Sequence, residues 1–473
     1  MSIGKVAPLK KSADVDMTEG NIAKHLITFA LPLIFGNLFQ MLYNMVDTWV
    51  VGNYVSDTAF SAVGTLASVT NLMIGFFTGL AGGVGVIISQ HFGAGNNERV
   101  KRAVHTAATL TLILCVVFTA LGLILVKPFM VILKMPSEVE PEAVSYLSVW
   151  FTGISSLMIY NMGSGIMRAV GDSRRPFYFL VVSAIINTVL DLLLVLVFDM
   201  GVVGVALATV IAQTVSALMV IITLMTANSA VRFQPKAMCL DRELLGKIIR
   251  IGIPTALQMS ITSFSNIFVQ SYINFFGKEC MGGWTAYSKI DQIVLLPMQS
   301  ISLATTTFVG QNLGKRQTER ADRGVNVGLM MSLASNVALI LPIMLFAGFF
   351  VSIFNSSPEI IEYGTMFLHW LTPFYLTWCI NQSYSGALRG SGNTTVPMII
   401  MLSSFVVFRQ VYLFVVSNFI SNTILLIAMA FPAGWVLSSI LTFVYYKKVG
   451  LMGKRSKMPH SFVQYDDEKE RAE

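Results

Sequence analysis

Charge is scarce in this sequence. Asp, Glu, Lys and Arg together make up 12 % of its 473 residues, whereas they make up about 25 % of an average soluble domain. Hydrophobic residues make up 54 %. Apolar windows such as 110–126, 177–197 and 202–225 are long enough for a helix to cross a bilayer core of about 30 Å. A β-barrel is excluded because its strands would alternate, so the sequence predicts an all-α polytopic membrane protein.

Cysteine is also scarce, and familiar catalytic motifs are missing. The four cysteines are scattered without a CxxC pair, so we expect no disulfide framework and no metal cluster. No GxxxxGK(S/T) phosphate-binding loop occurs, because the segment from Gly310 to Lys315 is one residue too short. No nucleophile–base set stands out. We therefore expect neither an enzyme nor a cofactor, and we expect an H⁺ or Na⁺ gradient as the energy source.

The sequence does contain twelve segments of membrane-spanning length. The first twenty residues are polar and hold Asp14, Asp16 and Glu19, so they are not a secretory signal peptide. We predict spans near 25–50, 59–90, 103–130, 142–168, 176–198, 201–226, 247–276, 284–311, 324–354, 360–388, 396–418 and 422–446. These spans divide the chain into an N-terminal tail (1–23), an N-terminal lobe (24–227), a linker (228–246), a C-terminal lobe (247–446) and a C-terminal tail (447–473).

The positive charges are distributed by side of the membrane. Most of the 32 Lys and Arg lie in the tails, in the linker and in the loops that follow even-numbered spans. Cytoplasmic loops are enriched in Lys and Arg, so both termini are predicted to be cytoplasmic, in a plasma or inner membrane. The net charge of +7 is explained by topology, and we expect no nucleic-acid partner.

The two halves of the chain repeat each other. Pro32 and Asn44 recur 222 residues later as Pro254 and Asn266. The repeat extends to Gln90-His91-Phe92-Gly93 with Gln311-Asn312-Leu313-Gly314, and to Arg168-Ala169-Val170-Gly171-Asp172 with Arg389-Gly390-Ser391-Gly392-Asn393. Since each half has an even number of spans, we expect parallel six-helix lobes related by a pseudo-two-fold axis along the membrane normal, with the substrate path between them. Asp47 is not repeated, because Val269 stands at its counterpart.

This ordered set of motifs resembles the multidrug and toxic compound extrusion (MATE) transporters over nearly the whole chain. The residues that carry the resemblance are Pro32 with Asn44-Met45-Val46-Asp47-Thr48, Gly93-Ala94-Gly95, Arg168-Ala169-Val170-Gly171-Asp172, and their counterparts in the second half. Members of the NorM branch place cation-binding acids in spans seven and ten, where this chain has none within the membrane. The chain is more similar to the DinF branch. That resemblance implies a cation site at Asp47, Asn187, Asp191, Thr209 and Tyr146.

The physical chemistry of these residues agrees with that site. An Asp within a membrane costs about 2.5–3.5 kcal/mol and is by default a functional hypothesis. Asn187 and Asp191 are four apart and share a helix face. Counting 1.5 Å per residue places all five side chains in the outer half of the first lobe. Two close carboxylates favour a proton or a small cation, with Na⁺ as the only metal considered. In the alternative reading Asp47 lies at the interface and Asp191 pairs with an Arg.

Further polar residues in the spans are candidates for the substrate path. They are Asn44, Gln258, Asn266, Lys289, Asp291 and Arg409. Lys289 and Asp291 are two apart and cannot face each other on one helix stripe, so each is expected to pair with another span. For Arg409, a buried structural ion pair is the alternative to a role in transport.

Prolines mark candidate hinges at Pro32, Pro254, Pro297 and Pro373. Proline loosens a membrane helix where neighbours satisfy the freed carbonyl group. Pro297 corresponds to Gly75 and Pro373 to Gly153 in the repeat, a pattern that suits alternating access.

The predicted function is a cation-coupled (H⁺ or Na⁺) antiporter that exports amphipathic, cationic small molecules by alternating access, as a monomer in the lipid bilayer. One alternative is a flippase for lipid-linked oligosaccharides, which shares this architecture. Flippases line their cavity with Arg and Lys, whereas only Lys289 and Arg409 are available here. A non-transporting receptor or channel is a further alternative, and the repeat and the buried acids argue against it.

Overall fold

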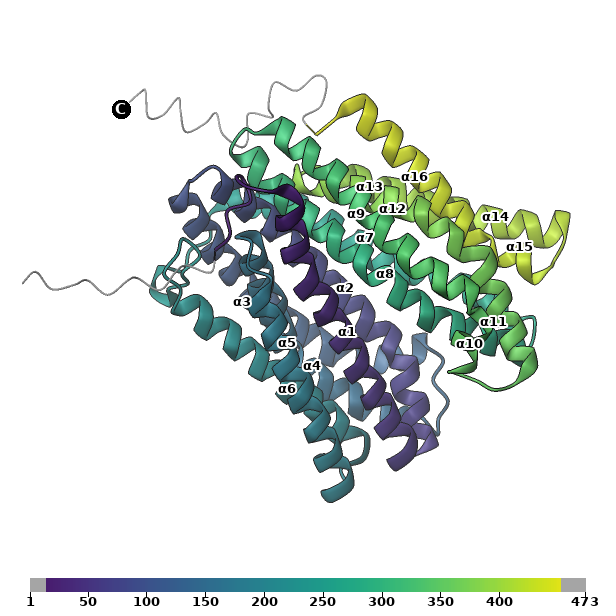
Figure 1. Cartoon of the computed structure of the whole chain (residues 1–473). Helices are drawn as coiled ribbons and strands as arrows, with labels where there is room; N and C mark the ends of the chain where they lie inside the picture. Colours follow the sequence, from purple (N-terminus) through teal and green to yellow (C-terminus); the bar gives the residue numbers. More distant parts are fainter. Residues whose placement is uncertain (1–13, 452–473) are drawn as a thin grey trace, which may run out of the picture. The chain divides into compact units, whose positions relative to one another are not determined.

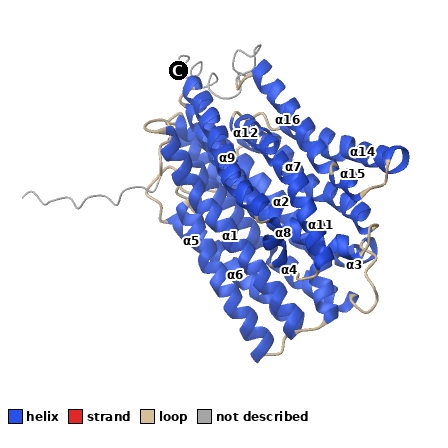
Figure 2. Ribbon diagram, turned by 45° about the vertical axis from the view of Figure 1, so that its right-hand side comes forward, coloured by secondary structure: helices blue, strands red, loops and turns tan. Residues whose placement is uncertain are grey.

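The computed structural model describes residues 14–451, apart from the side chains of 261–264, 267 and 268. Every regular element in that range is a helix (Figures 1 and 2). Residues 1–13 and 452–473, which make up most of the two predicted tails, lie outside the described residues.

The first half of the chain forms six long helices. They are α1 (Ile22–Tyr54), α2 (Asp57–Gly93), α3 (Asn97–Ile132), α4 (Glu140–Ala169), α5 (Arg174–Leu192), which continues as the π-helix η1 (Leu193–Val197), and α6 (Gly201–Met225). A linker with a short 3₁₀ turn, η2 (Pro235–Ala237), follows.

The second half is more interrupted. Its elements are α7 (Arg242–Asn274), α8 (Lys278–Gly314), α9 (Thr318–Leu345), α10 (Ala347–Ser352), α11 (Pro358–Leu371), η3 (Thr372–Phe374), α12 (Tyr375–Gly390), α13 (Thr395–Met401), η4 (Leu402–Phe408), α14 (Arg409–Val415), η5 (Val416–Ile420), α15 (Ile424–Ala428) and α16 (Ala430–Val449). Here η3 is a 3₁₀ turn, and η4 and η5 are π-helices.

These elements correspond to the twelve predicted spans. Ten helical segments of the described chain are long and apolar enough to cross a membrane. The 33-residue helix α7 and the pair α11 and α12, which η3 divides at Pro373, account for the other two predicted spans. The chain is therefore a multi-pass membrane protein.

The sequence repeat is also a structural repeat. Helices α1 and α7 both have 33 residues, and α2 and α8 both have 37. The turns after α4 and α12 use the same backbone: Gly171 and Gly392 have φ values of 84° and 87°, a left-handed conformation that favours glycine. In both turns the next amide donates five residues back, from Asp172 to Met167 and from Asn393 to Leu388.

The chain divides into two compact units whose boundaries coincide with the repeated prolines. One unit contains residues 31–253 with the first twenty residues, and the other contains 21–30 with 254–473. Helix α1 therefore passes from one unit to the other between Ala30 and Leu31, directly before Pro32, and α7 does so between Ile253 and Pro254. Each of these helices has a proline at the point where it changes unit.

In the first unit α4 is the central helix and packs against α2, α3 and α6. Small residues allow the close approach of α4 and α6: a Cβ atom on Gly153 would lie 2.3 Å from Val210, and one on Gly163 would lie 2.0 Å from Val220. Close packing through small residues is the usual way in which membrane helices associate. The tight contact fixes α4 relative to α6, and α5 also packs against α6.

In the second unit α8 packs against α9, α11 and α12. Its core is aromatic, with Trp284 against Phe367 and Phe431, and Trp435 against Tyr375 and Trp378. These rings surround the segment of α8 that carries Lys289 and Asp291.

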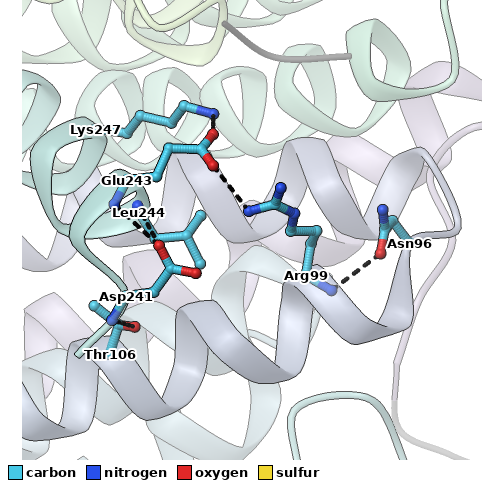
Figure 3. A network of polar contacts seen from close by, with 7 residues as sticks. All are labelled: Asn96, Arg99, Thr106, Asp241, Glu243, Leu244 and Lys247. Carbon is cyan, nitrogen blue, oxygen red and sulfur yellow. Dashed lines mark hydrogen bonds and ion pairs between the residues drawn. The ribbon is translucent and has the colours of Figure 1, made fainter. Parts of the chain in front are cut away.

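The linker is fastened to α3 at its C-terminal end (Figure 3). The Asp241 carboxylate caps α7 by accepting from the amides of Glu243 and Leu244 at 3.0 and 3.1 Å, and its own amide donates to the Thr106 hydroxyl at 3.2 Å. Arg99 pairs with Glu243 at 3.1 Å, and Lys247 pairs with the same carboxylate. Partial burial opposes ionisation of Glu243, but the two cations outweigh it and hold its pKa below the usual value.

Candidate functional site

The two acids of the first unit face each other. Asp47 lies in the second half of α1, and Asp191 lies in the last turn of α5. Each carboxyl group is within hydrogen-bonding reach of the other. Asp191 is fully buried, at 0 % exposure. The prediction that these two residues share one site is therefore consistent with the structure.

The polar atoms of this site lack partners in the described chain. Two ionised carboxylates cannot donate to each other, and in that form neither oxygen of Asp191 nor Oδ1 of Asp47 has a hydrogen bond within residues 14–451. Both side-chain atoms of Asn187, which is 2 % exposed, are also without a partner there. Orphaned buried polar atoms of this kind require an explanation, and an ion or a proton supplies one.

Two tyrosines and a wall of valines complete the site. The hydroxyl groups of Tyr43 and Tyr146 are close enough to interact electrostatically with both carboxyl groups. Apolar side chains from α1, α2, α6 and η1 pack beside Tyr146 and exclude water, and they include Val50, Val51, Ala59, Val195, Val202 and Val205. Tyr43 was not predicted, although it stands four residues before Asp47 and so shares its helix face.

Thr209 is the predicted ligand with the least support. Its hydroxyl group is nearly buried and donates to the carbonyl of Val205 on its own helix at 3.1 Å. No contact between Thr209 and either acid is recorded in the described part of the chain. Helices α5 and α6 are joined one turn away, where Ser183 donates to the Ala212 carbonyl at 2.9 Å.

The electrostatics of the site favour a cation. Within residues 14–451 no Lys or Arg forms an ion pair with Asp47 or Asp191. The alternative in which Asp191 pairs with an Arg is therefore wrong. Close negative charges in an apolar surrounding repel strongly, so the pair can hold a proton or bind a monovalent cation.

The polar residues predicted on the substrate path do not form one cluster. Asn44 is exposed, and its carbonyl accepts from Thr48 at 2.8 Å. Gln258 is buried and contacts the sulfur of Met401. Asp291 accepts from Tyr375, whose hydroxyl group lies 3.0 Å from that of Tyr287.

Lys289 and Arg409 differ from the structural alternative considered for them. The described residues offer no ion-pair partner to Lys289, which is half-buried on α8. Arg409 is buried, and its partners are Ser265 and the exposed Asn266 rather than an acid. The expected buried ion pair of Arg409 is therefore wrong, because an amide, a hydroxyl group and two aromatic rings surround its guanidinium.

The predicted hinges fall into two classes. Pro373 lies in a 3₁₀ turn that separates α11 from α12. Pro32, Pro254 and Pro297 lie inside continuous helices. Of these three, Pro32 and Pro254 stand at the boundaries between the compact units.

Comparison with known proteins places this geometry in a family. The MatE family model matches the chain twice, at residues 32–193 and at residues 254–415, which are the two halves of the repeat. The chain belongs to the MATE family of transporters. It is a membrane transporter rather than an enzyme, and members of this family need no cofactor.

Relatives cover most of the chain. The probable multidrug resistance protein YpnP of Bacillus subtilis is 27 % identical over 91 % of this chain and 96 % of its own length. The probable multidrug resistance protein NorM of Thermotoga maritima is 28 % identical over 92 % of this chain and 94 % of its own length. The solved structure of a MOP superfamily transporter from Pyrococcus furiosus superposes with a TM-score of 0.87 at 23 % identity, covering 93 % of this chain and 98 % of that chain. The predicted fold of twelve membrane helices in two six-helix lobes is confirmed.

Proposed function

We propose that this MATE transporter is a cation-coupled antiporter of the DinF-like branch. The observation that carries the proposal is the facing pair Asp47 and Asp191, with Asn187 beside it and no basic partner in the described residues. Tyr146 and Tyr43 border the ion, and Thr209 is the remaining candidate ligand. H⁺ and Na⁺ both fit the chemistry of this donor set.

Occupation of the acidic site drives the transport cycle. A ligand shifts an equilibrium only through different affinities for its two states. When the ion enters from outside, it removes the repulsion between Asp47 and Asp191 and allows α1 and α5 to approach. Helix α1 also carries Pro32 at a unit boundary. Bending there gives the change at Asp47 a route to the rest of α1, and this suits a hinge.

The exported substrate is an amphipathic small molecule. The names of the relatives YpnP and NorM, both probable multidrug resistance proteins, support a drug-like substrate. A flippase for pyrophosphate-linked lipids needs several cationic side chains, and the second unit offers Lys289 and the buried Arg409. We further propose a monomer in the plasma membrane, with lipid around the lobes at 24–227 and 247–446 and both termini in the cytoplasm.

Efflux of a fluorescent organic cation from proteoliposomes tests this function. The purified protein is reconstituted with the dye inside, and an inward pH gradient or an inward Na⁺ gradient is imposed separately. We expect one of the two gradients to accelerate dye efflux at least severalfold over protein-free liposomes. Equal efflux with and without either gradient would show that the protein is not an ion-coupled antiporter for this dye class.

A further inference from the structure

The second unit contains a permanent buried cation without an acid to balance it. Arg409 is 1 % exposed. Its Nη1 donates to Oδ1 of Asn266 at 3.0 Å and to the Ser265 hydroxyl at 3.3 Å, while its Nε has no partner in the described chain. The guanidinium carbon lies 4.8 Å from the ring centre of Phe405 and 4.4 Å from that of Phe431. Oxygen acceptors and aromatic faces together make an environment that binds cations.

Arg409 occupies the counterpart of the acidic site in the first unit. Pro176 and Ser183 on α5 recur 221 residues later as Pro397 and Ser404. The π-helix η4 then adds one residue, as its wider turns require, so the buried positions after it are 222 apart. In this register Asn187 corresponds to Arg409, and Asp191 corresponds to Leu413.

The facing helix gives the same correspondence. The repeat equates Tyr43 with Ser265 and Asn44 with Asn266, both of which contact the guanidinium. It equates Asp47 with Val269, which is fully buried. The second unit therefore has neither acid at this place, and has an arginine side chain where the first unit has room for an ion.

We propose that the guanidinium of Arg409 is a covalently attached cation that fills the second unit's counterpart of the ion site, so that only the first unit exchanges an ion with solution. The statement about exchange rests on the proposed function, whereas the filled cation site does not. Arginine suits this role because it stays protonated in proteins and its planar group fits between two rings. A charge that cannot leave keeps this lobe in one electrostatic state throughout the cycle.

Two replacements of similar length separate charge from packing. Arg409→Lys keeps a cation near Asn266, and Arg409→Met fills the space without charge. We expect the Lys variant to retain at least about half of the dye efflux and the Met variant to lose about tenfold or more, since one hydrogen-bonded charge contributes roughly 1.5–3 kcal/mol. Wild-type efflux by the Met variant would overturn the proposal.

Chemical rescue tests the site independently of transport. Arg409→Ala leaves a space lined by Phe405, Phe431 and Asn266, and millimolar guanidinium chloride should bind there and raise the Tm of this variant. A ligand at ten times its Kd raises the Tm of a lobe of this size by about 3–5 °C. Urea, which has the same shape without the charge, should not raise it. If Arg409→Ala does not accumulate as folded protein, the Lys and Met comparison decides.

A matched cavity without a cation serves as the control. Leu413 lies one turn further along α14 and is fully buried. Leu413→Ala should have a lowered Tm that guanidinium does not restore. Equal effects of guanidinium and urea on Arg409→Ala, or equal rescue of both variants, would overturn the filled cation site. If rescue is specific but gradients do not drive efflux, the proposed antiport fails and the cation site stands.

Discussion

Individual side chains were predictable where their chemistry is unusual for a membrane. Asp47, Asn187 and Asp191 were found because acids in a span are costly, because the spacing of four residues puts two of them on one face, and because the chain resembles a family. The partners of Arg409 were not found, since a single sequence does not tell which residues of different helices meet. Tyr43 could have been found from its spacing to Asp47.

Asn187 is expected to contribute an oxygen ligand to the bound cation. In Asn187→Ala the cation concentration for half-maximal efflux should rise about ten- to hundredfold, because a hydrogen bond or contact to a charged group contributes roughly 1.5–3 kcal/mol. Titration of dye efflux against pH or Na⁺ measures this. Ser183→Ala is the control: Ser183 lies one turn away and donates to the Ala212 carbonyl. An unchanged half-maximal concentration in Asn187→Ala would remove the amide from the site.

At the scale of helices, hydropathy predicted where the spans lie, and it did not predict how they are interrupted. The twelve apolar segments all became helical, since a backbone in lipid must satisfy its own hydrogen bonds. The π-helices η4 and η5 carry no recognisable sequence pattern, because their register depends on packing against neighbouring helices. The change of unit within α1 and α7 is likewise a long-range property, although the prolines that accompany it were predicted.

Pro32 is expected to act as a hinge in α1. Pro32→Ala supplies the missing amide donor to the preceding turn and stiffens the helix. We expect severalfold slower efflux from proteoliposomes, with a Tm that is unchanged or higher. Pro128→Ala is the control, because Pro128 lies inside α3, a helix wholly within one unit. Equal slowing by both substitutions would mean that the effect is a general response to helix stiffening.

For the whole molecule, the repeat predicted the architecture. Even spans per half, matching motifs and the placement of Lys and Arg were sufficient for two six-helix lobes, because each of these signals depends on local sequence. Substrate choice was not predictable from the same signals, since it depends on side chains that converge from several helices.

The predicted topology can be tested with the native cysteines. Cys239, in the linker, is exposed, whereas Cys115, Cys280 and Cys379 are buried. A membrane-impermeant maleimide applied to intact cells should leave the wild-type protein unlabelled, and it should label Cys239 after permeabilisation. Ser137→Cys, in the exposed loop after α3, should be labelled in intact cells. Labelling of the wild type in intact cells would place the linker outside.

The central claim is that the pair Asp47 and Asp191 couples the ion gradient to export. Asp47→Asn and Asp191→Asn each remove one charge from a site without a basic partner in the described residues, so neither should harm insertion, and removing a buried acid eases it. Asp199→Asn is the control, since Asp199 is exposed beyond the end of η1.

The most direct measurement is gradient-driven dye efflux by these three variants in proteoliposomes, with folding checked by size-exclusion chromatography. We expect Asp47→Asn and Asp191→Asn to be folded and to lose the acceleration by the gradient almost completely, and Asp199→Asn to behave as the wild type. Efflux at the wild-type rate by both site variants under the same gradient would contradict the mechanism.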